Sequence, residues 1–223
     1  DVLLHLRQLA PPASLPIDAA AAHKLSQYDH AAVDVETSLL LDWYWPAVKG
    51  APCPETVRSE FRALWRAAFD SLVSSPALVL RDFHSPNLIW LPERAGKARV
   101  GLIDFQDALI GHSAYDLVSL LQDARLDVPL ELERRLLSRY VADAGLAEAS
   151  FDGDAFHYAY ALFGLQRNTK ILGIFARLAL RDGKRQYLRH LPRIWGYVER
   201  NLETVKLVSL GKWYERNLPA PYR

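Results

Sequence analysis

Apolar residues recur every three or four positions through the first third of the chain, which is the spacing of amphipathic helices. The pattern covers three segments, residues 2–9, 31–48 and 55–72. Proline ends the first segment at Pro11 and disturbs the second at Pro46, because proline cannot donate a helical hydrogen bond. We therefore predict three helices, with a proline-rich loop reaching Pro16 after the first.

The pattern changes after residue 76. Short apolar runs at 77–80, 88–91 and 99–103 are separated by turn-rich or charged loops, which is typical of strands. Helical spacing then returns at 115–124, 130–143 and 154–180, followed by one or two helices that end near residue 210. Gly164 and Gly173 are expected to interrupt the longest of these helices.

This order of elements predicts an α+β fold that is mostly helical, with a small β-hairpin region between two groups of helices. The chain has 223 residues, half of them hydrophobic, so one large domain can bury a substantial core. No apolar run is long enough to cross a bilayer.

The charge balance limits the kinds of partner that we expect, and the cysteine content indicates the cellular compartment. The 27 Lys and Arg nearly cancel the 26 Asp and Glu, so neither nucleic acid nor an anionic membrane surface is expected as a partner. The only cysteine, Cys53, excludes an internal disulfide framework and fits a reducing compartment. We expect a cytoplasmic protein that binds small ligands, of unknown oligomeric state.

Polar residues of chemical interest concentrate in two loops beside the predicted strands. Asp82 and Asn87 lie between the first two strands, and Asp104 follows the third. A path of strand, loop, strand, turn and strand through one small sheet would bring all three side chains to the same end. Phosphoryl transfer needs such a set, because a carboxylate positions the attacking hydroxyl while hard oxygen ligands hold Mg²⁺. Taken singly, Asp82 and Asn87 are also ordinary turn-forming residues.

Three motifs together resemble the signature of the aminoglycoside-phosphotransferase/choline-kinase superfamily. They are D-x-H-x-x-N at 82–87, I-D-F-x-D at 103–107 and Gly-His-Ser-Ala-Tyr-Asp at 111–116. The resemblance implies a protein-kinase-like fold and an enzyme that uses ATP and Mg²⁺ to phosphorylate a hydroxyl of a small molecule. It implies that Asp82 is the catalytic base and that Asn87 and Asp104 hold the metal. The residues that it implies as supports of the loop are His84, Asp107 and Asp116.

The helical tail at 166–177 resembles one branch of this superfamily, the cell-wall-recycling kinases that phosphorylate the anomeric hydroxyl of N-acetylmuramate and N-acetylglucosamine. Gln166 and Lys170 are four residues apart and Arg167 and Lys170 three, so they share a helix face. We expect this face either to contact the sugar or to be an ordinary solvated surface.

Two departures separate the chain from protein kinases: Leu80 replaces a histidine, and Gln106 replaces the glycine of Asp-Phe-Gly. We find no glycine-rich nucleotide loop and no Val-Ala-x-Lys strand. The chain also begins with Asp and contains no Met. We therefore expect residues 1–223 to be the C-terminal lobe of a kinase-like enzyme, without the N-terminal nucleotide lobe and nearly inactive alone.

Three alternatives remain open from the sequence. An aminoglycoside or an amino alcohol could be the substrate, although the cations of the tail favour an acidic sugar. The chain could be a catalytically inactive pseudokinase that acts as a scaffold. His84 and His112 could also combine with Asp82 and Asp104 in a metal-dependent hydrolase, although His112 is more typical of a turn residue.

Overall fold

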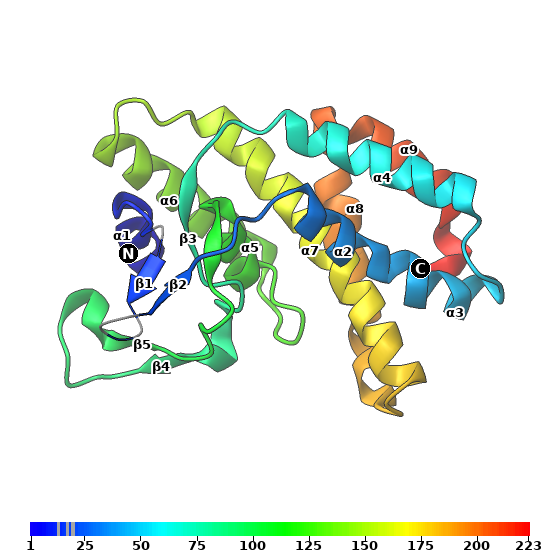
Figure 1. Cartoon of the computed structure of the whole chain (residues 1–223), viewed down its shortest axis with the longest axis horizontal. Coiled ribbons are helices and arrows are strands. Elements are labelled where there is room, and N and C mark those ends of the chain that lie inside the picture. The colour runs from blue at the N-terminus through cyan, green and yellow to red at the C-terminus, as the bar shows by residue number, and fades with distance from the viewer. Residues whose placement is uncertain (13, 17, 19–20) are drawn as a thin grey trace. The chain divides into compact units, whose positions relative to one another are not determined.

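The computed structural model describes residues 1–12, 14–16, 18 and 21–223, and it divides the chain into two compact units (Figure 1). The first unit comprises residues 1–29 and 73–160, and the second comprises residues 30–72 and 161–223. Helices dominate both, with short antiparallel strands in the first, which confirms the mostly helical α+β prediction. In the described part of the chain, no helix has both the length and the apolar character needed to span a bilayer.

Within its described residues, the first unit contains three two-stranded antiparallel sheets, four α-helical segments and two short 3₁₀ helices (Ser85–Asn87 and Gly96–Arg99). The paired strands are β1 (Ser14–Pro16) with β2 (Ala22–Lys24), β3 (Pro76–Val79) with β6 (Leu109–His112), and β4 (Leu88–Trp90) with β5 (Val100–Leu102). The helices are α1 (Val2–Gln8), α5 (Ala114–Leu121), α6 (Leu130–Ala147) and the first residues of α7 (Gly153–Leu180).

The prediction that one sheet joins the three middle strands was wrong. Only β4 and β5 form the expected hairpin, while β3 pairs with β6, a strand that the sequence pattern did not reveal. A β-carbon at Gly111 of β6 would lie 3.1 Å from Val79 and 3.2 Å from Tyr28, so close packing favours glycine there. Because Gly111 interrupts the apolar residues of β6, the sequence pattern did not predict a strand there. Strand β1 likewise lies in the proline-rich segment that was predicted to be a loop, and β2 lies in a stretch for which the sequence pattern predicted no element.

Helix α5 forms the centre of the first unit, because seven of its side chains are buried. Tyr115 contacts the ring of Tyr28 at a centroid distance of 5.3 Å, and Phe83 and Leu109 are buried with it in this unit. The helix is therefore fixed by apolar burial, at about 25 cal/mol per Å² of buried surface. Asp116 and Ser119, its polar residues, are buried as well.

The second unit is helical and is built around aromatic side chains. Its elements are α2 (His30–Leu39), a π-helical turn (Leu40–Tyr44), α3 (Trp45–Lys49), α4 (Glu55–Asp70), the rest of α7, α8 (Leu191–Leu202) and α9 (Val208–Asn217). Phe61 of α4 packs against Trp213 of α9 at a centroid distance of 4.2 Å with the rings tilted by 35°, and Trp195 donates to the hydroxyl of Tyr44 at 2.8 Å. Most of the tryptophans therefore serve as core residues, as is usual for this side chain.

Helix α7 runs without interruption through Gly164 and Gly173, which contradicts the predicted breaks. Both glycines instead permit close contacts within the second unit. A β-carbon at Gly173 would lie 2.3 Å from the backbone carbonyl of Leu39, and one at Gly164 would lie 2.7 Å from the amide of Asn201. Packing outweighs the helix-propensity cost of about 1 kcal/mol per glycine.

This contact predicts that Gly173→Ala destabilises the protein strongly. A methyl group there would overlap the Leu39 backbone, which cannot move aside as a flexible side chain could. We expect a loss of about 3 kcal/mol or more in the free energy of unfolding, measured by urea denaturation. Gly196→Ala in α8 is the matched control, since its β-carbon would meet no atom within 4 Å, and it should be neutral or stabilising. Equal midpoints for the two variants would contradict the close packing of α2 and α7.

Candidate active site

The buried carboxylate of Asp116, in the first turn of α5, holds the loop that follows β3. Its Oδ2 accepts the backbone N–H of Leu80 at 2.7 Å, and its Oδ1 accepts that of Arg81 at 3.0 Å. Only 2% of Asp116 is exposed. Because hydrogen bonds to a charged acceptor are roughly twice as strong as neutral ones, this carboxylate fixes two consecutive backbone amides in place.

The backbone at Arg81 is strained. Its φ angle is 68°, a left-handed conformation that residues with a β-carbon rarely adopt. The N–H of Asp82 donates to the carbonyl of Leu80 at 2.8 Å, which closes a three-residue turn around Arg81. Ser119 of α5 donates to the Arg81 carbonyl at 3.3 Å. Such strain costs about 1–3 kcal/mol and is retained where the surroundings impose it, here by the contacts from α5.

Asn87 connects this loop to the segment after β5. Its side-chain Nδ2 donates to the carbonyl oxygen of Asp82 at 3.0 Å and to Oδ2 of Asp104 at 3.1 Å. The Ile103 N–H also donates to the Asn87 carbonyl at 3.2 Å, which extends the hairpin pairing by one step. The structure therefore brings together Asp82, Asn87 and Asp104, which the sequence had placed at a common edge, although two separate sheets carry them.

Asp104 is exposed and is also held in a left-handed conformation, with a φ angle of 60°. Gln106 Nε2 donates to its Oδ1 at 2.6 Å, so each carboxylate oxygen faces a neutral amide. Sequence reasoning treated Gln106 only as a departure from protein kinases. Its amide is an additional partner for Asp104, which the spacing of two residues could have suggested.

The β4–β5 hairpin has two chemically different faces, because side chains alternate along a strand. Leu88 pairs with Leu102 and Ile89 pairs with Gly101, so Asn87, Ile89 and Ile103 share one face. Ile89 and Ile103 are 45% and 47% exposed. They form an apolar surface next to Asn87 and Asp104 that sequence reasoning missed.

His84 and His112 lie in different settings. His84 belongs to the loop, where its backbone N–H donates to the Asp82 carbonyl at 2.9 Å. His112 is the last residue of β6 rather than a turn residue, and its Nδ1 accepts the N–H of Ala114 at the start of α5 at 3.1 Å. Burial lowers the pKa of His112 to about 4, so the ring is neutral. Asp107 is exposed.

The site fits Mg²⁺ better than it fits a protein-only metal cage. Among the described residues, no group of three or more His, Cys, Asp or Glu side chains could hold a metal ion. Mg²⁺ is instead typically bound by one or two protein oxygen ligands together with water and substrate phosphates. Asp104, an exposed carboxylate with only amide neighbours, and Asn87 could supply such ligands.

The three predicted substrate residues belong to the second unit. Glu36 of α2, which is buried, accepts a hydrogen bond from Gln166 at 2.8 Å and forms a 2.7 Å ion pair with Lys170. Gln166 and Arg167 are buried too, and each keeps one polar side-chain atom without a hydrogen-bond partner in the described structure. These residues are therefore not a solvated helix face. Glu36 was missed because its partners lie 130 residues away in the sequence.

We predict that Glu36→Gln lowers the free energy of unfolding by about 3 kcal/mol, since breaking one partner of a buried pair leaves the other charge uncompensated. Urea denaturation measures this. Glu60→Gln, which removes an exposed pair with Arg216, is the control and should cost at most about 1 kcal/mol. Adding Lys170→Met to Glu36→Gln should recover part of the loss. A Glu36 variant as stable as the Glu60 variant would refute this network.

Curated relatives named N-acetylmuramate/N-acetylglucosamine kinase were found in several bacteria. The chain is 37% identical over 225 aligned residues to an N-acetylmuramate/N-acetylglucosamine kinase of Caulobacter vibrioides, covering 100% of this chain and 60% of the relative. It is 34% identical over 204 residues to the kinase of that name from Pseudomonas putida, covering 89% and 57%. The chain thus spans little more than half the length of these relatives.

A solved structure of a choline/ethanolamine kinase family protein from Mesorhizobium loti aligns with 96% of this chain and 80% of its own, at 11% identity and a TM-score of 0.49. The sequence model of the phosphotransferase enzyme family matches residues 1–157, which include the loop of Asp82, the β4–β5 hairpin and Asp116. This match covers well over half of the chain and contains every contact of the candidate site in the first unit. The chain belongs to the phosphotransferase enzyme family.

Proposed function

We propose that residues 1–223 are the C-terminal, catalytic lobe of an ATP- and Mg²⁺-dependent kinase that phosphorylates a hydroxyl of an amino sugar. One observation carries the proposal: Asn87 bridges the backbone of Asp82 and the carboxylate of Asp104. A proton acceptor and two hard ligands are thereby held in one small region, as phosphoryl transfer requires. The nucleotide loop and its lysine would come from residues outside this chain.

Each of the three residues has a distinct proposed role. Asp82 orients the substrate hydroxyl and accepts its proton as the hydroxyl oxygen attacks the γ-phosphorus and ADP leaves. Asn87 and Asp104 hold Mg²⁺, which when bound neutralises charge on the phosphate oxygens. Asp116, His84 and Asp107 support these residues. The hydrogen bonds of Asp116 to the loop backbone support its assignment.

The apolar surface of Ile89 and Ile103 is proposed to receive the adenine ring. Both side chains lie on the hairpin face that carries Asn87, and both are nearly half exposed. A flat aromatic base would cover this area while its phosphates reach Asp104. Burial of such surface contributes about 25 cal/mol per Å².

We propose that the substrate is N-acetylmuramate or N-acetylglucosamine, phosphorylated at the anomeric hydroxyl during cytoplasmic recycling of cell-wall sugars. The relatives that carry these names support the substrate class. Gln166, Arg167 and Lys170 are proposed to contact the sugar. Gln166 Oε1 and Arg167 Nη1 have no hydrogen-bond partner among the described residues, so a bound sugar could provide one.

A coupled kinase assay on the full-length gene product tests the proposal. With ATP and Mg²⁺, we expect phosphorylation of N-acetylmuramate and N-acetylglucosamine, but not of kanamycin or choline. Asp82→Asn should lower kcat by roughly 10²–10⁴-fold, the usual contribution of a general base, without changing the circular dichroism spectrum. Asp154→Asn, at an exposed position of α7, should keep the activity of the native protein.

Three results would overturn this function. An Asp82→Asn variant with native kcat would show that Asp82 is not the base. Phosphorylation of kanamycin or choline alone would assign another substrate class, and ATP binding without any transfer would indicate a pseudokinase.

A further inference from the structure

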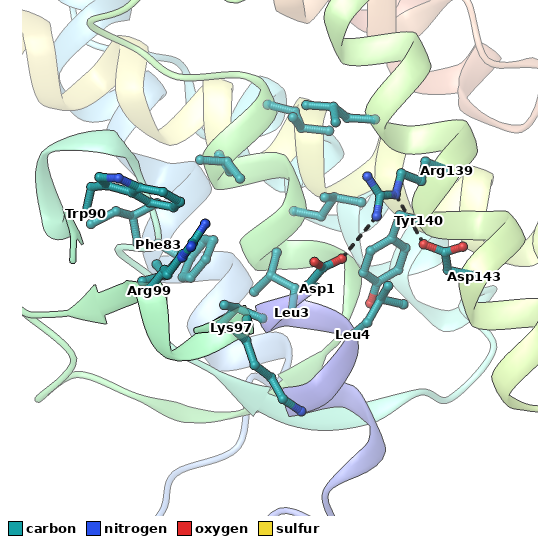
Figure 2. Close-up of a pocket in the computed structure, with 18 residues that line it drawn as sticks. Asp1, Leu3, Leu4, Phe83, Trp90, Lys97, Arg99, Arg139, Tyr140 and Asp143 are labelled. Carbon is teal, nitrogen blue, oxygen red and sulfur yellow. Dashed lines mark hydrogen bonds and ion pairs between the residues drawn. The ribbon is translucent and has the colours of Figure 1, made fainter. Parts of the chain in front are cut away.

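A cavity of about 540 Å³ lies in the first unit, beside the β4–β5 hairpin (Figure 2). Leu88 and Trp90 of β4 and Val100 of β5 line it, and these are the side chains that alternate with Ile89 and Asn87 along the hairpin. The cavity is therefore separate from the face that we propose for nucleotide and metal. Its volume falls within the range of about 300–1,000 Å³ that is usual for small-molecule sites.

The interior of the cavity is apolar. Helices α1, α5 and α6 contribute leucine side chains, and the loop after β3 contributes one aromatic ring; these residues are Leu3, Leu4, Leu117, Leu120, Leu121, Leu136 and Phe83. Trp90, which is 63% exposed, stands at one edge close to Arg99 and Phe83 (Figure 2). An exposed tryptophan beside an apolar cavity offers a flat surface on which a ring or an aliphatic chain can pack.

The charges around the cavity are not balanced. Arg139 contacts the carboxylates of Asp1 at 3.3 Å and Asp143 at 3.4 Å, so these three side chains together carry one net negative charge (Figure 2). Lys97 and Arg99, in the turn between β4 and β5, form no ion pair with any carboxylate in the described residues. Arg99 only donates its Nε to the carbonyl of Arg94 at 2.7 Å and lies 5.7 Å from the Trp90 ring centroid. The charged side chains that line the cavity therefore have one positive charge in excess, and the two cations without a carboxylate partner, Lys97 and Arg99, favour an anion.

We propose that this cavity binds a small amphipathic anion, with an apolar chain or ring among the leucines and a single acidic group at Lys97 and Arg99. The apolar part would gain from burial, and the acidic group would meet the two cations that lack a carboxylate partner. The proposal is independent of the kinase function, because none of these residues belongs to the proposed catalytic set. It concerns a second ligand site behind the hairpin.

The binding of 1-anilinonaphthalene-8-sulfonate to the full-length gene product tests the proposal by fluorescence titration. This probe combines an aromatic body with one sulfonate. We expect saturable binding at one site, competition by decanoate, and no competition by decylamine at the same concentration. The two competitors share the length of the apolar chain, so the difference reports the charge requirement.

Two variants locate the probe. Lys97→Glu combined with Arg99→Glu should weaken binding at least tenfold, whereas Arg134→Glu with Arg135→Glu, exposed residues of α6 outside the cavity, should leave the affinity unchanged. Leu120→Trp should fill the cavity and also weaken binding. Because Lys97 and Arg99 are exposed, their substitution keeps the test valid even if Leu120→Trp fails to fold.

Three outcomes would overturn the proposal. They are the absence of saturable binding, equal loss of affinity in the two charge-reversed pairs, and equal competition by decanoate and decylamine. The first would show that the cavity takes no such ligand. The others would place the probe elsewhere or make its charge irrelevant.

Discussion

The carboxylate of Asp116 is the interaction on which the candidate site depends. Two hydrogen bonds to consecutive backbone amides hold Arg81 in a left-handed conformation, and Asp82 follows directly. Without that acceptor, two amides at a buried position would lose their partners, and the strained turn would lose its main restraint. Because α5 itself is fixed by apolar burial, the position of the loop is determined by the core of the first unit.

The β4–β5 hairpin presents two faces with different side chains. Asn87, Ile89 and Ile103 lie on the face beside Asp104, and Leu88, Trp90 and Val100 line the cavity on the other. Gly101 adds no side chain to the face that carries Ile89. A β-carbon at this position would lie 3.3 Å from Leu91 and 3.4 Å from Ile89. The period of two along a strand thus separates the proposed nucleotide surface from the proposed anion site.

Local patterns predicted most helices and the three middle strands, because apolar periodicity and proline positions are visible in the sequence. These patterns gave wrong predictions where the structure depends on a contact between residues that are far apart in the sequence. Strand β6 escaped prediction because Gly111 is dictated by Val79 and Tyr28, and α7 continues through Gly173 because Leu39 packs against it. In the site, the motif spacing placed Asn87 near Asp104. The pairing of Glu36 with Lys170 is invisible to such spacing, since the two residues lie far apart along the chain.

The kcat of an Asp116→Ala variant of the full-length gene product tests most directly whether this carboxylate positions the proposed catalytic loop. Asp123→Ala is the matched comparison, because Asp123 is also buried and accepts two backbone N–H groups, from Arg125 at 2.7 Å and Leu126 at 3.0 Å. At a temperature where both variants remain folded by circular dichroism, kcat should fall at least about a hundredfold in the Asp116 variant and stay near native in the Asp123 variant, a difference of about 2.7 kcal/mol in activation free energy. Equal kcat values in the two variants would contradict the central role of Asp116.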